Sequence, residues 1–328
     1  MPFGGMASSE PDPDPPLSGL APDEAFALLG SDTRLAIVRA LWDAGAHHTF
    51  DDVDDDAGTV AFSDLQHAVS VRDNGQFNYH LSRLVPQLVT QTADGYRLSG
   101  AGKAVARSIA TVTGESLFAD ERDLERPCPI CGGRLTAEYD DQWLRVTCDS
   151  CPGSFGELGH EGTVYNAPFP PAGLEDRTPD EALTVGLRRC MLDAAYLVRR
   201  ICRECAGAVS ASVSVCEGHD PEEGYCGSCG TPYAVWGDVR CDTCRFAKRL
   251  PVEVFAMGLT PVIAFCHDHG VDLLTPTLDD LEAVEAGFET DVSHDPLRID
   301  VTISAGDEFL AVAFDDTLSP LAIERQLE

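Results

Sequence analysis

The chain has 328 residues and carries 55 acidic against 23 basic side chains, which gives a formal net charge of −32. This charge excludes a generic nucleic-acid coat protein and a protein that binds anionic membranes, because both need a basic surface. The hydrophobic share of 44% excludes a disordered acidic chain. Aspartate outnumbers glutamate by 34 to 21, and only two lysines accompany 21 arginines. This composition is typical of adaptation to molar salt, and the length suffices for two or three domains.

The N-terminus and the cysteines indicate the compartment. No run of 18 apolar residues occurs, so no transmembrane helix is expected. Met1–Ala21 lacks Lys, Arg and an apolar core, and it is expected to be a disordered leader rather than a secretory signal. The protein is therefore predicted to be cytoplasmic, without a membrane partner. In that reducing compartment, Cys-x-x-Cys pairs are expected to bind metal rather than to form disulfides.

None of the thirteen cysteines precedes Cys128, so the first 127 residues are treated separately from the rest. Helices are expected at Pro22–Leu29 and from the N-cap Ser31 to Trp42. The aspartate-rich segment Asp51–Gly58 is expected to be a solvated loop. Ser63 and Asp73 each begin a predicted capping box, ten residues apart. A short helix, a tight turn and a new helix form the layout of a helix–turn–helix.

The second helix of this pair is expected to run from Asn74 to Val85, because Pro86 cannot continue it. Its buried side is predicted to consist of apolar residues at helical spacing, namely Phe77, Leu81, Leu84 and Leu88. Its other side carries side chains of the kinds that pair with base edges and phosphates in a major groove, namely Gln76, Asn78, Tyr79, Ser82 and Arg83. A polar solvent face is the alternative interpretation. Solvent faces elsewhere in this chain are rich in acids, whereas this one has none after Asp73.

Alternating residues on both sides of Asp94-Gly95 predict a β-hairpin. A hairpin directly after a recognition helix is a wing, on which Arg97 is well placed to contact phosphate. Ser99 is expected to cap a last helix, from Gly100 to Val112. The candidate DNA contacts are therefore Ser63, Gln76, Asn78, Tyr79, Ser82, Arg83 and Arg97.

This order of elements resembles the ArsR-like winged helix–turn–helix regulators, and in particular their haloarchaeal branch. The resemblance covers about residues 22–112, and it is carried by the segments Leu29–Ile37, Gly75–Leu81 and Gly95–Leu98. It implies a sequence-specific regulator of transcription that binds double-stranded DNA. It also implies a homodimer formed through helices 31–42 and 100–112, which would contact two half-sites about one helical turn apart. Some family members sense metals through cysteines in or near the recognition helix, and this chain has none there.

The charge distribution favours the same segment as the DNA-binding part. Residues 22–112 contain 12 acids and 7 bases, and five of these acids lie in 51–56. Outside that loop the segment is balanced, with seven of each sign. Residues 113–328 contain 40 acids and 16 bases. The N-terminal segment is therefore the part that is expected to approach DNA.

Two Cys-x-x-Cys pairs, Cys128 with Cys131 and Cys148 with Cys151, are separated by sixteen residues. The intervening segments 135–139 and 143–147 alternate as the strands of a hairpin. This pattern predicts a zinc ribbon, in which four thiolates complete a tetrahedral shell with no open position.

An extended linker at 166–173 precedes a long helix, which is expected to run from the capping box of Thr178 and Glu181 to about Ile201. The lone Cys190 within it is interpreted as a buried hydrophobic residue. Further candidate ligands follow, namely Cys202, Cys205, Cys216, His219, Cys226, Cys229, Cys241 and Cys244. The simplest pairing is sequential, with the first four on one zinc ion and the last four on another. The spacing also permits an interleaved pairing, and about three zinc ions are predicted in all.

One helix is expected over 252–269. Cys266, His267 and His269 near its end suggest a fourth metal site, but helical spacing turns them to different faces and favours an ordinary helix terminus. Another helix is expected over 278–288. The segments 297–303 and 309–314 predict a closing β-hairpin. This half is similar to the zinc-binding domain that follows the winged helix in haloarchaeal regulators.

The predicted fold class is α+β and multidomain. It comprises the leader (1–21), a winged helix–turn–helix domain (22–112) and a first zinc ribbon (113–165). A long helix with two zinc knuckle units follows (166–250), and of these units one has three cysteines and a histidine as ligands and the other has four cysteines. C-terminal helices and a hairpin complete the chain (251–328).

The predicted function is a DNA-binding transcription regulator whose zinc sites are structural or linked to an effector. An adaptor of the transcription machinery, similar to archaeal transcription factor E with its winged helix and zinc ribbon, is the alternative. A zinc hydrolase is disfavoured, since every predicted site has four protein ligands. No enzymatic activity is predicted.

Overall fold

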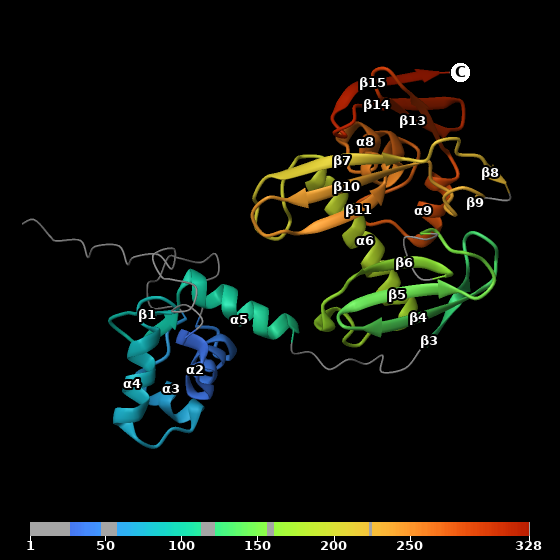
Figure 1. The fold of residues 1–328 in the computed structure, drawn as a ribbon. Helices are drawn as coiled ribbons and strands as arrows, with labels where there is room; N and C mark the ends of the chain where they lie inside the picture. The colour runs from blue at the N-terminus through green and yellow to red at the C-terminus, as the bar shows by residue number, and fades with distance from the viewer. Residues whose placement is uncertain (1–26, 47–57, 113–121, 156–160, 223–224, 328) are drawn as a thin grey trace, which may run out of the picture. The chain divides into compact units, whose positions relative to one another are not determined.

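The computed structural model describes residues 27–46, 58–112, 122–155, 161–222 and 225–327 (Figure 1). Its contacts divide the chain into two compact units, Met1–Gly114 and Glu115–Glu328. The predicted leader, the start of the helix predicted at 22–29 and the aspartate-rich loop through residue 57 lie outside the described residues. Residues 27–29 are helical, as predicted.

The N-terminal unit contains the predicted series of helices and the hairpin. Its elements are α2 (Asp32–Asp43), α3 (Phe62–Val69), α4 (Asn74–Leu84), β1 (Val89–Gln91), β2 (Tyr96–Leu98) and α5 (Gly100–Val112). One core joins them, because apolar residues at helical spacing turn inward from each helix. Its most buried residues include Ile37, Val38, Leu41, Leu65, Phe77, Leu81 and Leu84, none of them more than 1% exposed.

The start of α3 differs from the prediction. Its N-cap is Ala61, and Ser63 lies within the first turn, where its exposed hydroxyl donates to Asp64 Oδ1 at 3.3 Å. The helix begins earlier because Phe62 packs inward, with its ring 5.0 Å from that of Phe77. The predicted cap of α4 is confirmed, since Asp73 Oδ1 accepts a hydrogen bond from the backbone N–H of Gln76 at 2.6 Å.

The hairpin β1–β2 is antiparallel, with Val89 opposite Leu98. Val60 extends it, because its backbone N–H and C=O both bond to Tyr96 at 2.9 Å. Ser99 caps α5 as predicted, since its hydroxyl accepts from the amide of Gly102 at 3.1 Å. At Gly102, α5 passes close to the residue that precedes the hairpin: a Cβ there would lie 2.0 Å from the carbonyl oxygen of Leu88.

Gly102→Ala is therefore expected to destabilise the N-terminal unit by about 1–3 kcal/mol, because the added methyl group must displace backbone. Gly100→Ala is the matched control, since a Cβ at Gly100 in the same helix meets nothing within 4 Å. Amide hydrogen exchange over residues 27–112 of the full chain would measure both. Equal protection in the two variants would contradict the close approach of α5.

The first sheet of the C-terminal unit is antiparallel in the order β3-β4-β5-β6. Its strands are β3 (Arg122–Pro127), β4 (Arg134–Asp140), β5 (Trp143–Cys148) and β6 (Thr163–Pro168). The pair β4–β5 is the predicted hairpin, with Tyr139 opposite Leu144, and the outer strands were not predicted. The predicted extended linker is therefore only partly extended. Its first residues belong to β6, and its last form the short 3-10 helix η3 (Pro171–Gly173).

Helix α6 (Pro179–Leu197) joins the two cores of this unit. Its capping box is confirmed, since Thr178 and Glu181 each accept from the other's amide, at 3.3 and 2.8 Å respectively. Its N-terminal half, with Leu183, packs on the first sheet, and its C-terminal half, with Met191 and Leu197, enters the second core.

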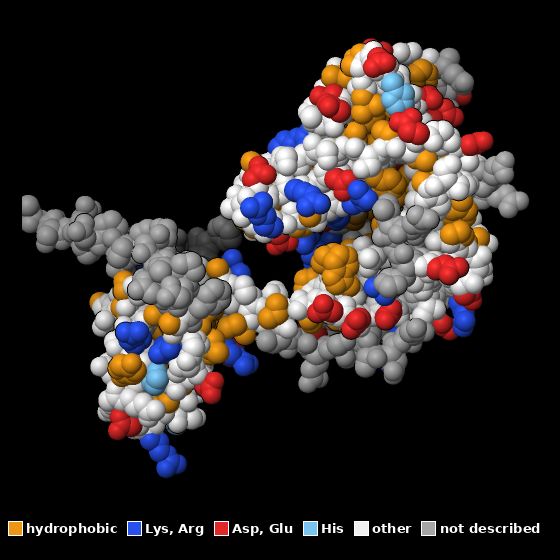
Figure 2. All heavy atoms as spheres, in the orientation of Figure 1, with side chains coloured by type: hydrophobic (Ala, Val, Ile, Leu, Met, Phe, Trp, Pro, Cys, Tyr) orange, Lys and Arg blue, Asp and Glu red, His pale blue; other side chains and the backbone are white. Residues whose placement is uncertain are grey.

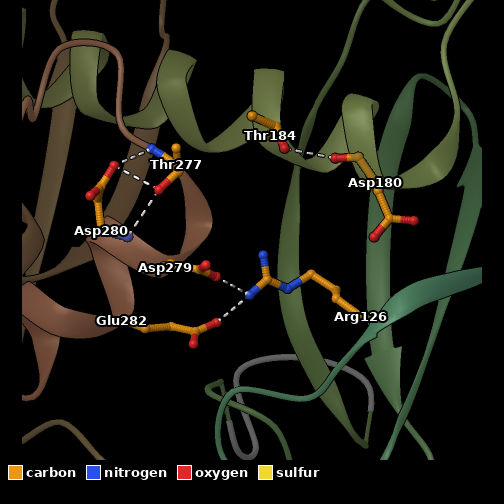
Figure 3. Close-up of polar contacts among 7 residues, drawn as sticks. All are labelled: Arg126, Asp180, Thr184, Thr277, Asp279, Asp280 and Glu282. Atoms are coloured by element: carbon orange, nitrogen blue, oxygen red, sulfur yellow. Dashed lines mark hydrogen bonds and ion pairs between the residues drawn. The ribbon is translucent and has the colours of Figure 1, made fainter.

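Polar contacts also tie the first sheet to the helices of the second core. Arg126 of β3 pairs with Asp279 at 3.2 Å and Glu282 at 2.7 Å, both on α9 (Leu278–Glu285). Figure 3 shows this fork beside the capping box of α9, in which the side chains of Thr277 and Asp280 face one another. The first sheet is thus held at two places along the C-terminal unit, by α6 and by α9.

The second core lies between two further sheets. One has the order β11-β10-β7, with β7 (Val209–Val215), β10 (Val235–Cys241) and β11 (Ala247–Pro251). The other follows chain order, with β12 (Phe288–Ser293), β13 (Arg298–Ala305), β14 (Glu308–Phe314) and β15 (Pro320–Leu327). The predicted closing hairpin is its central pair β13–β14, and β12 and β15 were not predicted. A short hairpin, β8 (Pro221–Glu222) and β9 (Tyr225–Cys226), lies between β7 and β10 in the chain.

The helix predicted over 252–269 is wrong in one respect: it is two helices, α7 (Val252–Ala256) and α8 (Thr260–Asp268). At Gly258 the chain passes so close to α6 that a Cβ would lie 2.5 Å from the carbonyl group of Ala194. Pro261, which lacks an amide donor, sits in the first turn of α8, where no donor is needed. The helix predicted to reach Phe288 ends at Glu285. In the described part of the chain, no helix has the length and apolarity to cross a bilayer.

Candidate metal centres and nucleic-acid interface

All twelve predicted metal ligands lie in three clusters, and within each cluster the ligand atoms are within 4.8 Å of one another. Site A consists of Cys128, Cys131, Cys148 and Cys151, as predicted. Site B consists of Cys202, Cys205, Cys241 and Cys244. Site C consists of Cys216, His219, Cys226 and Cys229. The sequential pairing of the last eight ligands is therefore wrong, and site C is nested within site B along the chain.

The strand β7 explains the nested order. Its seven extended residues lie between Cys205 of site B and Cys216 of site C and span roughly 20 Å at about 3.3 Å per residue. Its antiparallel partner β10 places Cys241 opposite Val209 at one end and Val235 opposite Val215 at the other. At each end of the β7–β10 pair, the ligands therefore come from chain segments that adjoin both strands. Site B forms at one end and site C at the other.

The distances within the clusters fit a tetrahedral metal ion. Cys128 Sγ lies 3.8 Å from Cys151 Sγ, and Cys202 Sγ lies 3.6 Å from Cys244 Sγ. In site C, Nδ1 of His219 is 3.6 Å from Cys229 Sγ. A disulfide would need about 2.05 Å, whereas metal–sulfur bonds of about 2.3 Å in a tetrahedron place sulfurs about 3.8 Å apart.

Backbone amides point at the sulfurs in the same way in each site. The residue two positions after a ligand cysteine donates to its sulfur at 3.4 Å, and the donors are Gly133, Ser150, Ser228 and Thr243. Such amides stabilise thiolates, the form that binds metal. These knuckle turns follow from the Cys-x-x-Cys spacing, and they explain why that spacing could be recognised in the sequence.

The surroundings of the ligand thiols lower the pKa of some of them and raise the pKa of others. Backbone hydrogen bonds at Cys244 and Thr243 lower the pKa of Cys241 to about 6, against the effect of burial. Backbone hydrogen bonds beginning with that of Asp220 lower the pKa of Cys226 to about 6. Burial, together with neighbouring thiols, raises the pKa of Cys148 to about 12. Four thiols cannot all ionise side by side without a compensating cation, and a divalent metal supplies that charge.

A buried ion cluster next to site B was not predicted. Asp193 of α6 is 5% exposed and pairs with both Arg203 and Lys248. Arg203 lies between two ligands of site B in the sequence, and Lys248 lies on β11. The cluster therefore fixes site B against α6. Its sequence signal was the presence of Lys248 in a chain with two lysines.

The two remaining cysteines are not in these clusters. Cys190 packs against the second core, in line with its interpretation as a hydrophobic residue. Cys266 is 3% exposed, and burial raises its pKa to about 11. Within the described ranges, Cys266, His267 and His269 form no ligand cluster. Nδ1 of His269 lies instead 2.8 Å from the carbonyl oxygen of Phe265.

The outward face of α4 carries the side chains that the sequence placed there. All five are exposed, namely Gln76, Asn78, Tyr79, Ser82 and Arg83, and the large ring of Tyr79 is 58% exposed. The predicted inward residue Leu88 is 2% exposed, just beyond the helix. Exposed Arg72 precedes the helix and was not predicted as a contact.

The described part of the N-terminal unit contains seven basic and five acidic residues. Figure 2 shows a face of this unit on which basic, histidine and apolar side chains gather with few acids. The other two candidate contacts lie outside α4. Ser63 is exposed in α3, and Arg97 is half-buried on β2, opposite Thr90.

Comparison with known families gives two matches. Residues 125–319 match the family model described as Domain of unknown function (DUF7351), and residues 22–109 match Domain of unknown function (DUF7347). The first match covers more than half of the chain, so the chain belongs to the DUF7351 family. No curated protein and no solved structure matches the chain.

Proposed function

We propose that the protein is a sequence-specific DNA-binding transcription regulator. In this proposal the N-terminal unit is a winged helix–turn–helix domain of the ArsR-like type. Helix α4 enters the major groove, and the hairpin β1–β2 is the wing. The observation that carries the proposal is the outward face of α4, which exposes amide, hydroxyl and guanidinium groups and has no acid, in a chain of net charge −32.

The geometry of the helix pair supports this assignment. α3 and α4 are joined by a short turn in which Ser70 adopts a left-handed conformation (φ 59°). Gln66 of α3 donates to Asn74 Oδ1 at the start of α4, at 2.8 Å. The buried residues on the inward face of α4 hold this helix in place, so the polar residues on its outward face lie on a rigid element. Asn and Arg on such a face recognise adenine and guanine edges.

We further propose that sites A, B and C bind zinc and stabilise the C-terminal unit. Each has four protein ligands of the sulfur and nitrogen types that zinc prefers, without an open position for substrate or water. A homodimer formed through α2 and α5 is part of the same proposal. It is supported by apolar residues near the end of α5, where Val112 is 52% exposed.

The proposal predicts that Asn78→Ala and Arg83→Ala each weaken binding to the preferred sequence by about 10- to 100-fold, since a base contact contributes about 1–3 kcal/mol. The preferred sequence is first selected from random double-stranded DNA in molar KCl, and affinities are then measured on it. Arg240→Ala is the control, because it removes the same positive charge as Arg83→Ala but from an exposed position on β10. It is expected to leave affinity unchanged.

Two outcomes would overturn the proposal. One is the absence of any preferred sequence in the selection. The other is unchanged affinity in both α4 variants. If the chain instead co-purified with RNA polymerase and left no sequence-specific footprint, the adaptor function of the transcription factor E type would replace it.

A further inference from the structure

Strand β7 is an edge strand of its sheet. The order β11-β10-β7 places β10 on one side of it, and no strand of the described ranges pairs with its other side (Figure 1). The backbone bonds just beyond its ends show which of its residues face β10. The N–H of Cys216 donates to the carbonyl oxygen of Ala234 at 2.9 Å, and the N–H of Asp242 donates to that of Ala208 at 3.3 Å. Because hydrogen-bonded and non-hydrogen-bonded pairs alternate in an antiparallel ladder, the even-numbered residues 210, 212 and 214 bond to β10.

The odd-numbered residues of β7 therefore direct their backbone N–H and C=O groups to the free edge. Val209 shows this direction, since its N–H donates to the carbonyl oxygen of Arg200 at 3.3 Å, on the side away from β10. Ala211, Val213 and Val215 have no such partner among the described residues. Their side chains are only partly buried where they pack against the second core. Three donors and three acceptors at every second residue form a template for another strand.

This edge carries none of the features that usually keep a strand from pairing with another chain, such as charged side chains, proline or a β-bulge. Its seven residues are Val, Ser and Ala alone, and its register with β10 is regular throughout. By contrast, 24% of the whole chain is charged. The strand at the opposite edge of the same sheet, β11, carries Lys248 and Arg249. The uncharged edge of β7 is therefore the side of this sheet that another strand can approach.

The sequence of β7 is complementary to a second copy of itself. A two-fold axis at Val213 places Val213 opposite Val213, Ala211 opposite Val215 and Ser212 opposite Ser214 of the second copy. Small apolar side chains then face one another on the core side of the sheet, and serines face one another on the solvent side. All three residues with free backbone groups fall in hydrogen-bonded pairs of this alignment. Such an interface is isologous, since both copies use the same strand.

The two ends of the free edge also carry opposite charges. Arg200 lies beside Val209, and its guanidinium bonds to a backbone carbonyl and a hydroxyl in the turn before β15. Glu217 follows the other end of β7, and its side chain is 81% exposed. Antiparallel pairing brings Glu217 of each copy to the Arg200 end of the other. Ile201, which is 38% exposed next to Arg200, adds an apolar contact at the same place.

We propose that β7 pairs antiparallel with β7 of a second copy of the chain, and that the two three-stranded sheets thereby form one continuous six-stranded sheet. Self-pairing is favoured over a strand from another protein because β7 itself supplies the matching side chains, and the segments at its ends supply the opposite charges. The interface lies within the C-terminal unit. It is independent of DNA binding by α4 and of the proposed contact between α2 and α5.

Residue-resolved amide hydrogen exchange of the zinc-loaded full chain tests this pairing. As the protein concentration is raised, the N–H groups of Ala211, Val213 and Val215 are expected to pass from fast to slow exchange, because the second copy supplies their acceptors. The N–H groups of residues 210, 212 and 214 are expected to exchange slowly at every concentration, because β10 supplies theirs. This alternation distinguishes pairing at the edge from a dimer formed elsewhere in the chain, including one through α2 and α5.

Val213→Pro is expected to raise the concentration at which Ala211 and Val215 become protected by about 10- to 100-fold, because the two-fold axis removes the same hydrogen bond twice. The lost N–H faces the edge and not β10, and proline is tolerated at such positions. Ala247→Pro is the matched control. The N–H of Cys241 bonds to the neighbouring Phe246 at 2.8 Å, so the N–H of Ala247 faces the free edge of β11. This control is expected to leave the concentration unchanged.

Three outcomes would overturn the proposal. Exchange of Ala211, Val213 and Val215 that stays fast at every concentration would leave the edge to a strand of another protein. Slow exchange at every concentration that persists in Val213→Pro would mean that the chain covers its own edge. An equal shift in Ala247→Pro would assign the effect to a general loss of stability. Slow exchange of residues 210, 212 and 214 shows in each variant that the sheet is folded.

Discussion

Removal of metal is expected to abolish the cooperative fold of residues 122–327 while the N-terminal unit stays folded. Binding at a structural zinc site is worth on the order of 10 kcal/mol, comparable with the whole stability of a domain, about 5–15 kcal/mol. Cys202 and Cys241 belong to the second core, and Cys128 and Cys148 to the first. Emptying the sites therefore loosens both cores at once, and it leaves buried sulfurs without their ion.

Hydrogen exchange of the full chain with and without chelator would measure this effect. Protection is expected to vanish across the strands β3 to β15 and to persist in α2, α4 and α5, because no cysteine precedes Cys128. The N-terminal unit thus acts as the control within the same molecule. Retained protection of β7 and β10 in the metal-free chain would contradict the prediction.

Asp193→Ala is expected to destabilise the C-terminal unit by about 3–5 kcal/mol, since it leaves the largely buried Lys248 without its counter-charge and Arg203 with Glu204 alone. The side chains of Arg203 and Lys248 are only 19% and 15% exposed, and Arg203 Nη1 lies 2.8 Å from Asp193 Oδ1. Their charges lie next to site B and cannot be hydrated without opening the contact with α6. The loss is therefore larger than that of an ordinary ion pair.

Asp238→Ala provides the comparison. Asp238 pairs with Arg249 on the β10–β11 surface, where the arginine is 38% exposed, so about 1 kcal/mol or less is expected. Denaturant unfolding of the zinc-loaded chain would measure both variants. Combining Asp193→Ala with Lys248→Met should recover part of the loss, because one uncompensated cation is removed. Equal effects of the two aspartate substitutions would refute the special role of the cluster.

Local patterns in the sequence predicted the helices of the N-terminal unit and the exposed residues of α4, because amphipathic spacing alone decides which side of a helix is buried. They also predicted the hairpin of site A, whose ligands are joined by a single turn. They failed at Ser63, because the cap of α3 is decided by the packing of Phe62 on Phe77 across the core. The break at Gly258 likewise depends on the proximity of Ala194, which is distant in the sequence.

Assigning the eight ligands to sites B and C required knowledge of strand pairing. Spacing alone permits either order of four Cys-x-x-Cys or Cys-x-x-His pairs. The alternation of Val209–Val215 is a strand signal, and its recognition would have separated Cys205 from Cys216. The partner strand β10 is less regular, because Trp236 and Gly237 are both buried and obscure the alternation.

The nested arrangement of sites B and C bears on the register in which β7 pairs with β10. The sequence of β7, Val-Ser-Ala-Ser-Val-Ser-Val, repeats every two residues, so a slide of two positions along β10 would keep small apolar residues on one side and serines on the other. Hydrophobic burial alone therefore discriminates weakly between neighbouring alignments. A metal ion at each end would fail to bind if the strands were displaced, since its ligands lie in segments that adjoin both strands. The two ions would thus select a single register for a strand whose repetitive sequence permits several.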